Sequence, residues 1–270
     1  MEILIYFFIP LFGLAVGSFL NCVIYRLERG ESFLEGRSYC PHCRHILNWP
    51  DLIPVFSFLI LKGKCRYCSQ KIFWQYPLVE LATAIIFLTL YYNFFTMVNL
   101  LQFIFLLAIS CFLIIIFVYD LKHYIIPDKV VYPAIGFAFL YQLFRSLEFV
   151  NWNLFGIWNL EFGILRPILP SILASAFFLA IVLISRGKWM GMGDVKLAFL
   201  MGLFLGWPNI LVALFLAFLI GAIIGIGLIV AGKKTLKSEV PFGPFLVTGT
   251  FLALFWGEKL INYYLNFFNL

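Results

Sequence analysis

The stretch CFLIIIFVYD (residues 111–120) is an uninterrupted apolar run that ends in an acid. The 270-residue chain around it is 63% hydrophobic and 20% aromatic, and only 12% of its residues are charged. Soluble domains carry about twice that charged fraction. Because apolar runs near or above ~18 residues recur along the chain, the sequence predicts an all-α polytopic membrane protein rather than a large soluble core.

The apolar runs divide the chain into about eight candidate transmembrane helices, most of them close to the ~20 residues that cross a hydrocarbon layer. The first run has no basic segment before it and no small-residue cleavage site after it, which favours a retained span over a signal peptide. The candidate spans lie near residues 3–25, 77–95, 99–119, 130–147, 167–185, 194–206, 209–231 and 240–257.

Basic residues indicate the orientation of these spans. If residues 26–76 face the cytoplasm, sixteen of the nineteen Lys and Arg residues fall on the inner side, and only Arg145, Arg166 and Lys259 lie outside. This asymmetry predicts that both termini lie outside. The formal charge of +6 is then explained by orientation and by contact with anionic lipid. No basic soluble domain with interleaved aromatic residues is present to bind nucleic acid.

Residues 26–76 form the one long polar stretch, and it contains two Cys-x-x-Cys pairs, CPHC (40–43) and CRYC (65–68), separated by 21 residues. Two such pairs can place four thiolates tetrahedrally around Zn²⁺. Two disulfides or free thiols are the alternatives, but disulfides are rare in the cytoplasm. Because four thiolates leave no open position for water or substrate, the expected zinc is structural. The expected ligands are Cys40, Cys43, Cys65 and Cys68.

The expected domains follow from these features. They are a first transmembrane helix (1–25), a cytoplasmic tetracysteine zinc loop (26–76) and a membrane domain of about seven helices (77–270). A loop of about fifty residues has little core of its own, so metal binding would supply much of its folding free energy.

Four acids lie within or against the predicted spans: Glu80, Asp120, Asp128 and Asp194. Ionisable groups in a membrane are costly and point to function. Simpler roles are also open, because Asp128 and Asp194 can cap the helices that follow them and Asp120 can pair with Lys122 or His123. Asp120 is the hardest to explain in this way, since it ends an apolar helix, where an anion is unfavourable.

Asp120 and Asp194 fall on the same side of the membrane, 74 residues apart in the chain. Two aspartates that converge cannot both ionise readily, so one of them holds a proton at neutral pH. Such a pair can activate water with one carboxylate and protonate the leaving group with the other. Gly191 and Gly193 would let the backbone approach a substrate strand closely. A proton-coupled transporter is the competing hypothesis, since intramembrane acids also relay protons.

Together these motifs resemble the prepilin peptidases, or type IV leader peptidases, of the GxGD class of membrane aspartic proteases. The resemblance covers nearly the whole chain, including a first-span signature, a cysteine loop, the start of a second span, two aspartate motifs and a last-span motif. In that order the matching stretches are GSFLNCVIYRL (17–27), CPHC…WPDLIP…GKCRYC (40–68), YPLVEL (76–81), YDLKHYIIPD (119–128), GMGDVKLA (191–198) and PFGPFL (241–246).

The resemblance implies that Asp120 and Asp194 are the catalytic pair. It implies cleavage of basic leader peptides after a glycine, at the cytoplasmic face of the inner membrane, from type IV prepilins or from the pseudopilins of type II secretion and competence systems. Many family members then methylate the new N-terminal residue with S-adenosylmethionine. A loop with four cysteines is typical of this bifunctional form, and the resemblance implies that the four cysteines are zinc ligands. It also implies that Glu80 contributes to methyl transfer.

One position departs from the family pattern. Gln75 stands where the family often has Arg before the Tyr-Pro of YPLVEL. Gln keeps hydrogen-bonding ability but lacks the permanent charge, which puts methyl transfer in doubt and leaves proteolysis untouched. A third hypothesis is a non-catalytic assembly factor of a pilus platform that would use the zinc loop for docking.

Overall fold

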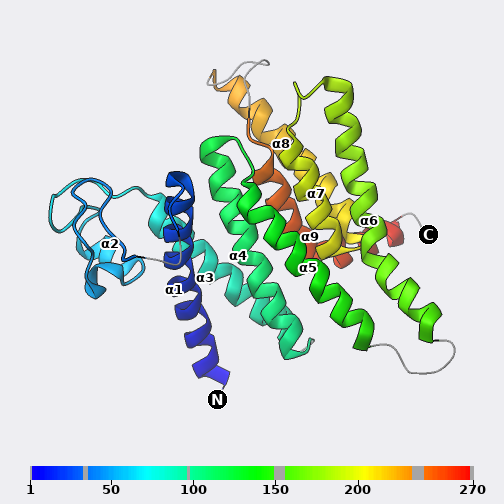
Figure 1. The fold of residues 1–270 in the computed structure, drawn as a ribbon, viewed down its shortest axis with the longest axis horizontal. Coiled ribbons are helices and arrows are strands. Elements are labelled where there is room, and N and C mark those ends of the chain that lie inside the picture. Colours follow the sequence, from blue (N-terminus) through cyan, green and yellow to red (C-terminus); the bar gives the residue numbers. More distant parts are fainter. Residues whose placement is uncertain (1, 33–35, 96–97, 149–155, 233–239, 268–270) are drawn as a thin grey trace. The chain divides into compact units, whose positions relative to one another are not determined.

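The computed structural model describes residues 2–32, 36–95, 98–148, 156–232 and 240–267, with side chains described from residue 5 and not over 147–148 or 156–166. Within these ranges the chain is helical, with two isolated β-bridges and no longer strand (Figure 1). The elements in chain order are α1 (Glu2–Arg29), η1 (Trp49–Leu52), α2 (Phe56–Ile60), α3 (Gln75–Phe94), α4 (Leu100–His123), α5 (Asp128–Glu148), α6 (Gly156–Ser185), α7 (Met192–Leu205), α8 (Asn209–Val230) and α9 (Gly243–Phe267).

This architecture confirms the predicted all-α membrane class, and each predicted span coincides with a helix. Among the described residues, six helices are long and apolar enough to cross a membrane: α1, α3, α4, α6, α8 and α9. Helix α7 has 14 residues, about 21 Å at the usual rise, which is shorter than a hydrocarbon layer of ~30 Å. Helix α5 carries charged residues in both its first and last turns. The count of eight spans therefore stays a prediction.

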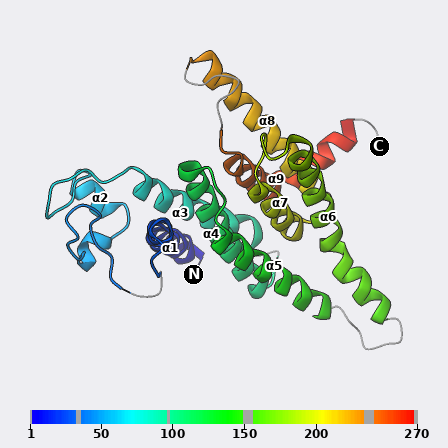
Figure 2. The same cartoon turned by 45° about the horizontal axis from the view of Figure 1, so that its top comes forward.

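The contacts of the chain group into two compact units, Met1–Ile115 and Ile116–Leu270. The predicted domain boundaries at 25/26 and 76/77 lie near the end of α1 and the start of α3, and they stay a prediction. In the first unit α1 packs along α3, and both helices are joined to the cysteine module, residues 30–74 (Figures 1 and 2).

Two glycines one turn apart on α1 set the distance between α1 and α3. A Cβ added to Gly13 would lie 2.6 Å from Ala84 Cα, and one added to Gly17 would lie 2.7 Å from Glu80 Cα. Small residues four apart allow transmembrane helix backbones to approach closely. Gly17 therefore brings the backbone of α1 against the residue of α3 that carries the buried acid Glu80.

In the second unit α7 is the central element, packed against α5, α6 and α9, while α8 and α9 pair along their length. Glycine again permits the close approach, since a Cβ on Gly202 of α7 would overlap the backbone of Ser171 on α6. Helix α7 begins after the extended N-cap residue Gly191 and ends at Gly206, which has a φ of 65°. Its first turn carries Asp194 into this packed centre.

Candidate functional site

Asp120 lies in the last turn of α4 and is only 4% exposed. Its Oδ2 accepts a hydrogen bond of 3.0 Å from the backbone N–H of Gly243, which is the first residue of α9. The first N–H groups of a helix have no carbonyl partner within the helix and carry its partial positive charge. The N-terminus of α9 therefore offsets the unfavourable position of Asp120 at the C-terminus of α4.

This contact requires a residue without a side chain at position 243. A Cβ at this position would lie 2.5 Å from Asp120 Oδ2 and 3.1 Å from its Cγ. Any larger residue would have to move either the start of α9 or the carboxyl group. Pro244 follows at the second helical position, where the missing N–H costs no internal hydrogen bond.

Asp194 is the third residue of α7 and is 8% exposed. Its Oδ2 accepts a hydrogen bond of 3.3 Å from the backbone N–H of Gly191, the N-cap residue. The simpler role considered from the sequence, a helix cap, is thus present in the structure. This hydrogen bond uses one of the two carboxylate oxygens of Asp194.

The structure brings the two aspartates together within one compact unit. The carboxyl group of Asp194 lies within range of the negative charge on Asp120, and α7 packs on α9, the helix whose first amide holds Asp120. Both carboxyl groups are buried, and each is oriented by one backbone N–H group. The catalytic pairing of these two carboxyl groups stays a prediction from the sequence.

The two glycines of GMGD differ in their surroundings. A Cβ on Gly193 would lie 2.9 Å from Ile126 Cβ, so this glycine lets the start of α7 pack against the segment that follows α4. A Cβ on Gly191 would meet nothing closer than 3.9 Å, so this glycine borders open space. Both had been expected to admit a substrate strand.

The third acid of this region, Asp128, forms an ion pair. Lys196 Nζ lies 2.6 Å from Asp128 Oδ1 and 4.9 Å from the centre of the Tyr132 ring. The pair joins the first turn of α5 to the first turn of α7, two residues after Asp194. The two residues are 68 positions apart in the chain.

The four cysteines of the two Cys-x-x-Cys pairs form one cluster in the cysteine module. Their sulfur atoms all lie within 4.8 Å of one another, and the Sγ atoms of Cys40 and Cys68 are 3.9 Å apart. A tetrahedral site with zinc–sulfur bonds of ~2.3 Å places its sulfurs about 3.8 Å apart. The spacing of these thiols therefore fits a metal ion, and Cys22 and Cys111 lie outside the cluster.

The backbone around the cluster repeats the same turn twice. In each turn the N–H of the first cysteine donates to the carbonyl group five positions later, and its carbonyl group accepts from the N–H four positions later. The residue four positions after this cysteine has a left-handed conformation, with a φ of 56° at Arg44 and 58° at Ser69. An isolated antiparallel bridge then closes the turn. The bridged pairs are Tyr39 with Ile46 and Lys64 with Lys71.

Hydrogen bonds that the sequence analysis did not predict join the short helix η1 to the second of these turns. Asp51, in η1, accepts a hydrogen bond of 2.7 Å from Arg66 Nε and one of 2.9 Å from the Tyr67 hydroxyl. Burial raises the pKa of Asp51, but the hydrogen bonds from Arg66, Tyr67 and the Asn48 amide outweigh it and hold the pKa below its usual value. The carboxylate form of Asp51 thus stabilises the module.

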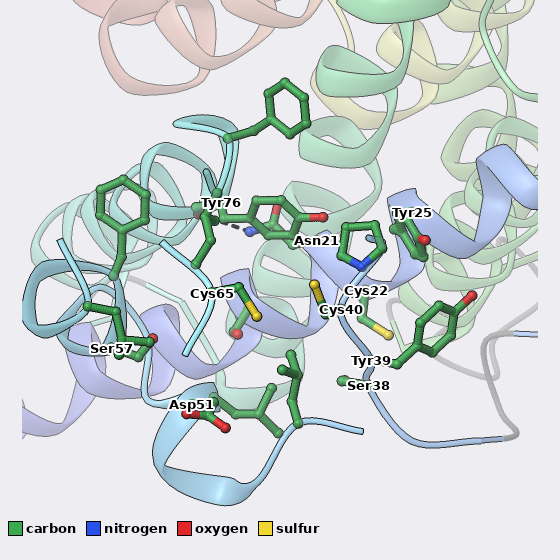
Figure 3. A pocket seen from close by; sticks show the side chains of 18 of the residues that line it. Asn21, Cys22, Tyr25, Ser38, Tyr39, Cys40, Asp51, Ser57, Cys65 and Tyr76 are labelled. Atoms are coloured by element: carbon green, nitrogen blue, oxygen red, sulfur yellow. Dashed lines mark hydrogen bonds between the residues drawn. The ribbon is translucent and has the colours of Figure 1, made fainter. Parts of the chain in front are cut away.

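A cavity lies where α1, the start of α3 and the cysteine module meet (Figure 3). Asn21 donates a hydrogen bond of 3.0 Å to the Tyr76 carbonyl on its wall, and Cys40 and Cys65 of the cluster also line it. The Tyr25 hydroxyl is buried without a hydrogen-bond partner among the described residues, although the Tyr39 ring lies beside it. A buried hydroxyl group without a hydrogen-bond partner is uncommon in proteins, and this one lies on the wall of the cavity.

Glu80 is part of this cavity wall and is 7% exposed. Its Oε2 accepts a hydrogen bond of 2.8 Å from the backbone N–H of Val55, which follows the WPDLIP stretch and has a φ of 61°. A positive φ is strained for a β-branched residue. Glu80 therefore fixes a strained turn of the cysteine module against α3.

Gln75, the position that departs from the expected pattern, lies at the start of α3. Its Nε2 is 3.4 Å from Asn21 Oδ1, so it contacts the residue that holds the Tyr76 carbonyl. The side chain supports the cavity wall without lining the cavity itself.

Comparison with known proteins covers both units of the chain. Residues 11–94 match the bacterial peptidase A24 N-terminal domain, and residues 105–226 match the type IV leader peptidase family. A relative from Aeromonas hydrophila, named prepilin leader peptidase/N-methyltransferase, is 31% identical over 96% of this chain and 93% of its own length. The chain belongs to the type IV leader peptidase family. This confirms the family expected from the sequence motifs.

Further relatives with the same name span nearly the whole chain. The protein from Bacillus subtilis is 31% identical over 94% of this chain and 96% of its own length. The protein from Pseudomonas aeruginosa is 32% identical over 95% of this chain and 92% of its own length. No solved structure matches the chain.

Gly243 is the site residue that sequence reasoning missed. It lies in PFGPFL, which had been recognised as a last-span motif without a role for any single residue. The available signal was a glycine followed by proline at the start of an apolar run, which is typical of a helix N-terminus. The sequence did not reveal that this helix start faces Asp120, 123 positions away.

Proposed function

We propose that the chain cleaves the leader peptides of prepilins or pseudopilins with Asp120 and Asp194 and then methylates the new N-terminal amine. The single observation that carries this is the pair of buried carboxyl groups, each held by a backbone amide at the start of a helix. Full-length similarity to prepilin leader peptidase/N-methyltransferases supports both activities. The comparisons give no support to a proton-coupled transporter.

The proposed cleavage uses water and the two aspartates. One carboxylate takes a proton from water as the water oxygen bonds to the scissile carbonyl carbon, and the other carboxyl group gives its proton to the carbonyl oxygen. Collapse of the tetrahedral intermediate breaks the C–N bond, and the leaving amine takes up the proton that the first carboxylate received. The second carboxylate recovers its proton from a hydroxyl group of the intermediate as the new carboxyl group forms. No covalent intermediate forms. The amide N–H of Gly243 keeps the carboxyl group of Asp120 oriented during these transfers.

The substrate must present an extended backbone at the site, because a helix hides its carbonyl groups in hydrogen bonds. A glycine before the scissile bond eases this local unwinding. The open space beside Gly191 admits such a strand next to Asp194. The distribution of basic residues supports a site on the cytoplasmic side, with both termini outside.

We place the methyl transfer in the cavity formed by α1, α3 and the cysteine module. S-adenosylmethionine supplies, when bound, a methyl group on a positively charged sulfonium. The carboxyl group of Glu80 and the rings of Tyr39 and Tyr76 on the cavity wall can face such a cation. The basic residues Arg26, Arg66 and Lys71 line other parts of the same wall. The unpartnered hydroxyl of Tyr25 offers a further hydrogen bond. Glu80 contributes by holding Val55, and with it the cavity wall, in position.

We also assign the cluster of Cys40, Cys43, Cys65 and Cys68 to a structural Zn²⁺. Four thiolates close the coordination shell, so the ion would hold the two turns together without binding substrate. Because Cys40 and Cys65 line the cavity, the ion would also fix the cavity wall.

The decisive test is mass spectrometry of the N-terminus of a prepilin co-expressed with the full-length enzyme in membranes. The wild type is expected to give cleaved and methylated product. Asp120→Asn and Asp194→Asn should each abolish cleavage, because neither can exchange the shared proton. Asp128→Asn is the matched control, since its carboxylate pairs with Lys196, and it should retain most cleavage. Full cleavage by Asp120→Asn or Asp194→Asn in a folded enzyme would contradict the dyad.

Gly243→Ala tests the amide that orients Asp120. The added methyl group would overlap Oδ2, and a displacement of about 1 Å in a catalytic group can lower the rate ~100-fold. We expect cleavage to fall at least tenfold in a time course with purified enzyme, while Gly136→Ala in α5, where a Cβ meets nothing within 4 Å, stays near the wild-type rate. Equal rates for the two variants would show that the contact does not orient Asp120.

Metal analysis of the purified protein tests the zinc assignment. We expect about one Zn²⁺ per chain, since a site of four thiolates binds one ion, and its loss in Cys65→Ser. Cys111→Ser, which changes a cysteine outside the cluster, should retain the metal. An unchanged zinc content in Cys65→Ser would disprove ligation by that residue.

Glu80 can be examined by comparing its alanine and glutamine variants. Glu80→Ala removes the acceptor for the Val55 amide and should lower methyl transfer about tenfold or more, the effect of a buried hydrogen bond to a charged group, with cleavage unchanged. Glu80→Gln keeps an oxygen acceptor and should retain most of the methyl transfer. If both variants lose methylation equally, the negative charge of Glu80, rather than its bond to Val55, is the required feature.

A further inference from the structure

The second cysteine turn also borders an open hollow, which adjoins the cavity of Figure 3 and shares part of its wall. We call it the basic groove and define it by Lys62, Lys64 and Lys71 together with Leu59, Phe73 and Trp74. Its volume is about 680 Å³, within the range of sites that hold small ligands. The cleavage and methyl transfer proposed above assign no step to these residues, although Lys71 and Phe73 also line the cavity of Figure 3.

The positive charges of the groove face each other. Lys64 and Lys71 are directly opposite across the antiparallel bridge that closes the second turn, and like charges in that relation destabilise the pair. Within the described part of the chain, no carboxylate pairs with Lys62, Lys64 or Lys71. The one carboxylate that reaches this turn, Asp51, is engaged by Arg66 and Tyr67. An external anion would therefore relieve a repulsion that the fold leaves in place.

The apolar side of the groove is exposed and lies where the chain enters the membrane. Leu59 is 62% exposed, and Phe73 and Trp74 are each 69% exposed. Trp74 directly precedes α3, whose Gln75–Phe94 range is long and apolar enough to span a bilayer. Aromatic residues at the end of a span lie at the level of the lipid headgroups, so the adjoining lysines are within reach of lipid phosphates.

We propose that the basic groove binds the headgroup of an anionic phospholipid. The phosphate lies between Lys64 and Lys71, with Lys62 beside it, and the glycerol and upper acyl carbons contact Leu59, Phe73 and Trp74. A free phosphate ion satisfies the lysines but leaves the exposed aromatic side chains in water, whereas a lipid covers both. The bound lipid ties the cysteine module to the membrane surface next to α3.

Native mass spectrometry of the full-length protein, released from detergent with added lipid, tests this binding. The probes are dioleoyl phosphatidylglycerol and dioleoyl phosphatidylcholine. We expect the wild type to retain one phosphatidylglycerol at least tenfold more tightly than phosphatidylcholine. Lys64→Gln/Lys71→Gln should weaken phosphatidylglycerol binding about tenfold or more, because each lysine near anionic lipid contributes on the order of 1 kcal/mol.

The matched control is Arg37→Gln/Arg44→Gln, which removes the same charge from exposed positions outside the groove on the same module. It should change lipid binding less than twofold, and neither variant should unfold at a lower temperature than the wild type. If the two variants weakened phosphatidylglycerol binding equally, the effect would come from the overall charge of the module, and the proposal would be wrong. Unchanged binding in Lys64→Gln/Lys71→Gln would overturn it as well.

Two further measurements separate a lipid from a simple anion. Phe73→Ser should weaken phosphatidylglycerol binding several-fold while leaving its salt dependence intact, because it removes apolar contact and no charge. Inorganic phosphate at millimolar concentration should fail to displace the lipid. Displacement by phosphate, together with no effect of Phe73→Ser, would make the groove an anion site and disprove the lipid assignment. All these readouts are independent of cleavage and methylation.

Discussion

The arrangement of the second unit depends on how one buried carboxyl group is accommodated. Asp120 ends an apolar helix, where the free carbonyl groups of α4 repel an anion. The compensating group is the first N–H of α9, 3.0 Å away. This contact requires α9 to start at that point, requires glycine as its first residue and directs α9 toward α4. Because α7 packs on α9, the same contact sets where Asp194 approaches.

The first unit accommodates its buried acid in a related way. Glu80 also accepts a backbone amide, that of Val55, which the chain holds in a strained conformation. The acid, the strained turn and the glycine contact at Gly17 lie at the same level of the α1–α3 pair. A buried acid that is satisfied by a backbone amide fixes the position of that backbone, and this links each acid to the shape of the site around it.

The sequence was sufficient to predict much of this molecule. Apolar runs located every long helix because each transmembrane segment must satisfy its own backbone hydrogen bonds, and the spacing of the cysteines predicted their cluster. The sequence could not predict which amide holds which acid, since Gly243 is 123 positions from Asp120 and Lys196 is 68 from Asp128. Such contacts depend on how helices pack, and the periodicity of an apolar helix does not encode its neighbours.

The two glycines of GMGD show the same limit of prediction from sequence, here for residues only two positions apart. From spacing alone they have one role, close approach to a substrate. In the structure Gly193 meets Ile126 and serves the packing of α7, whereas Gly191 borders open space and donates its N–H to Asp194. Of these two glycines, only Gly191 therefore has open space where a side chain would lie. Because its amide also orients the carboxyl group of Asp194, a strand that enters this space would meet an acid already held in place.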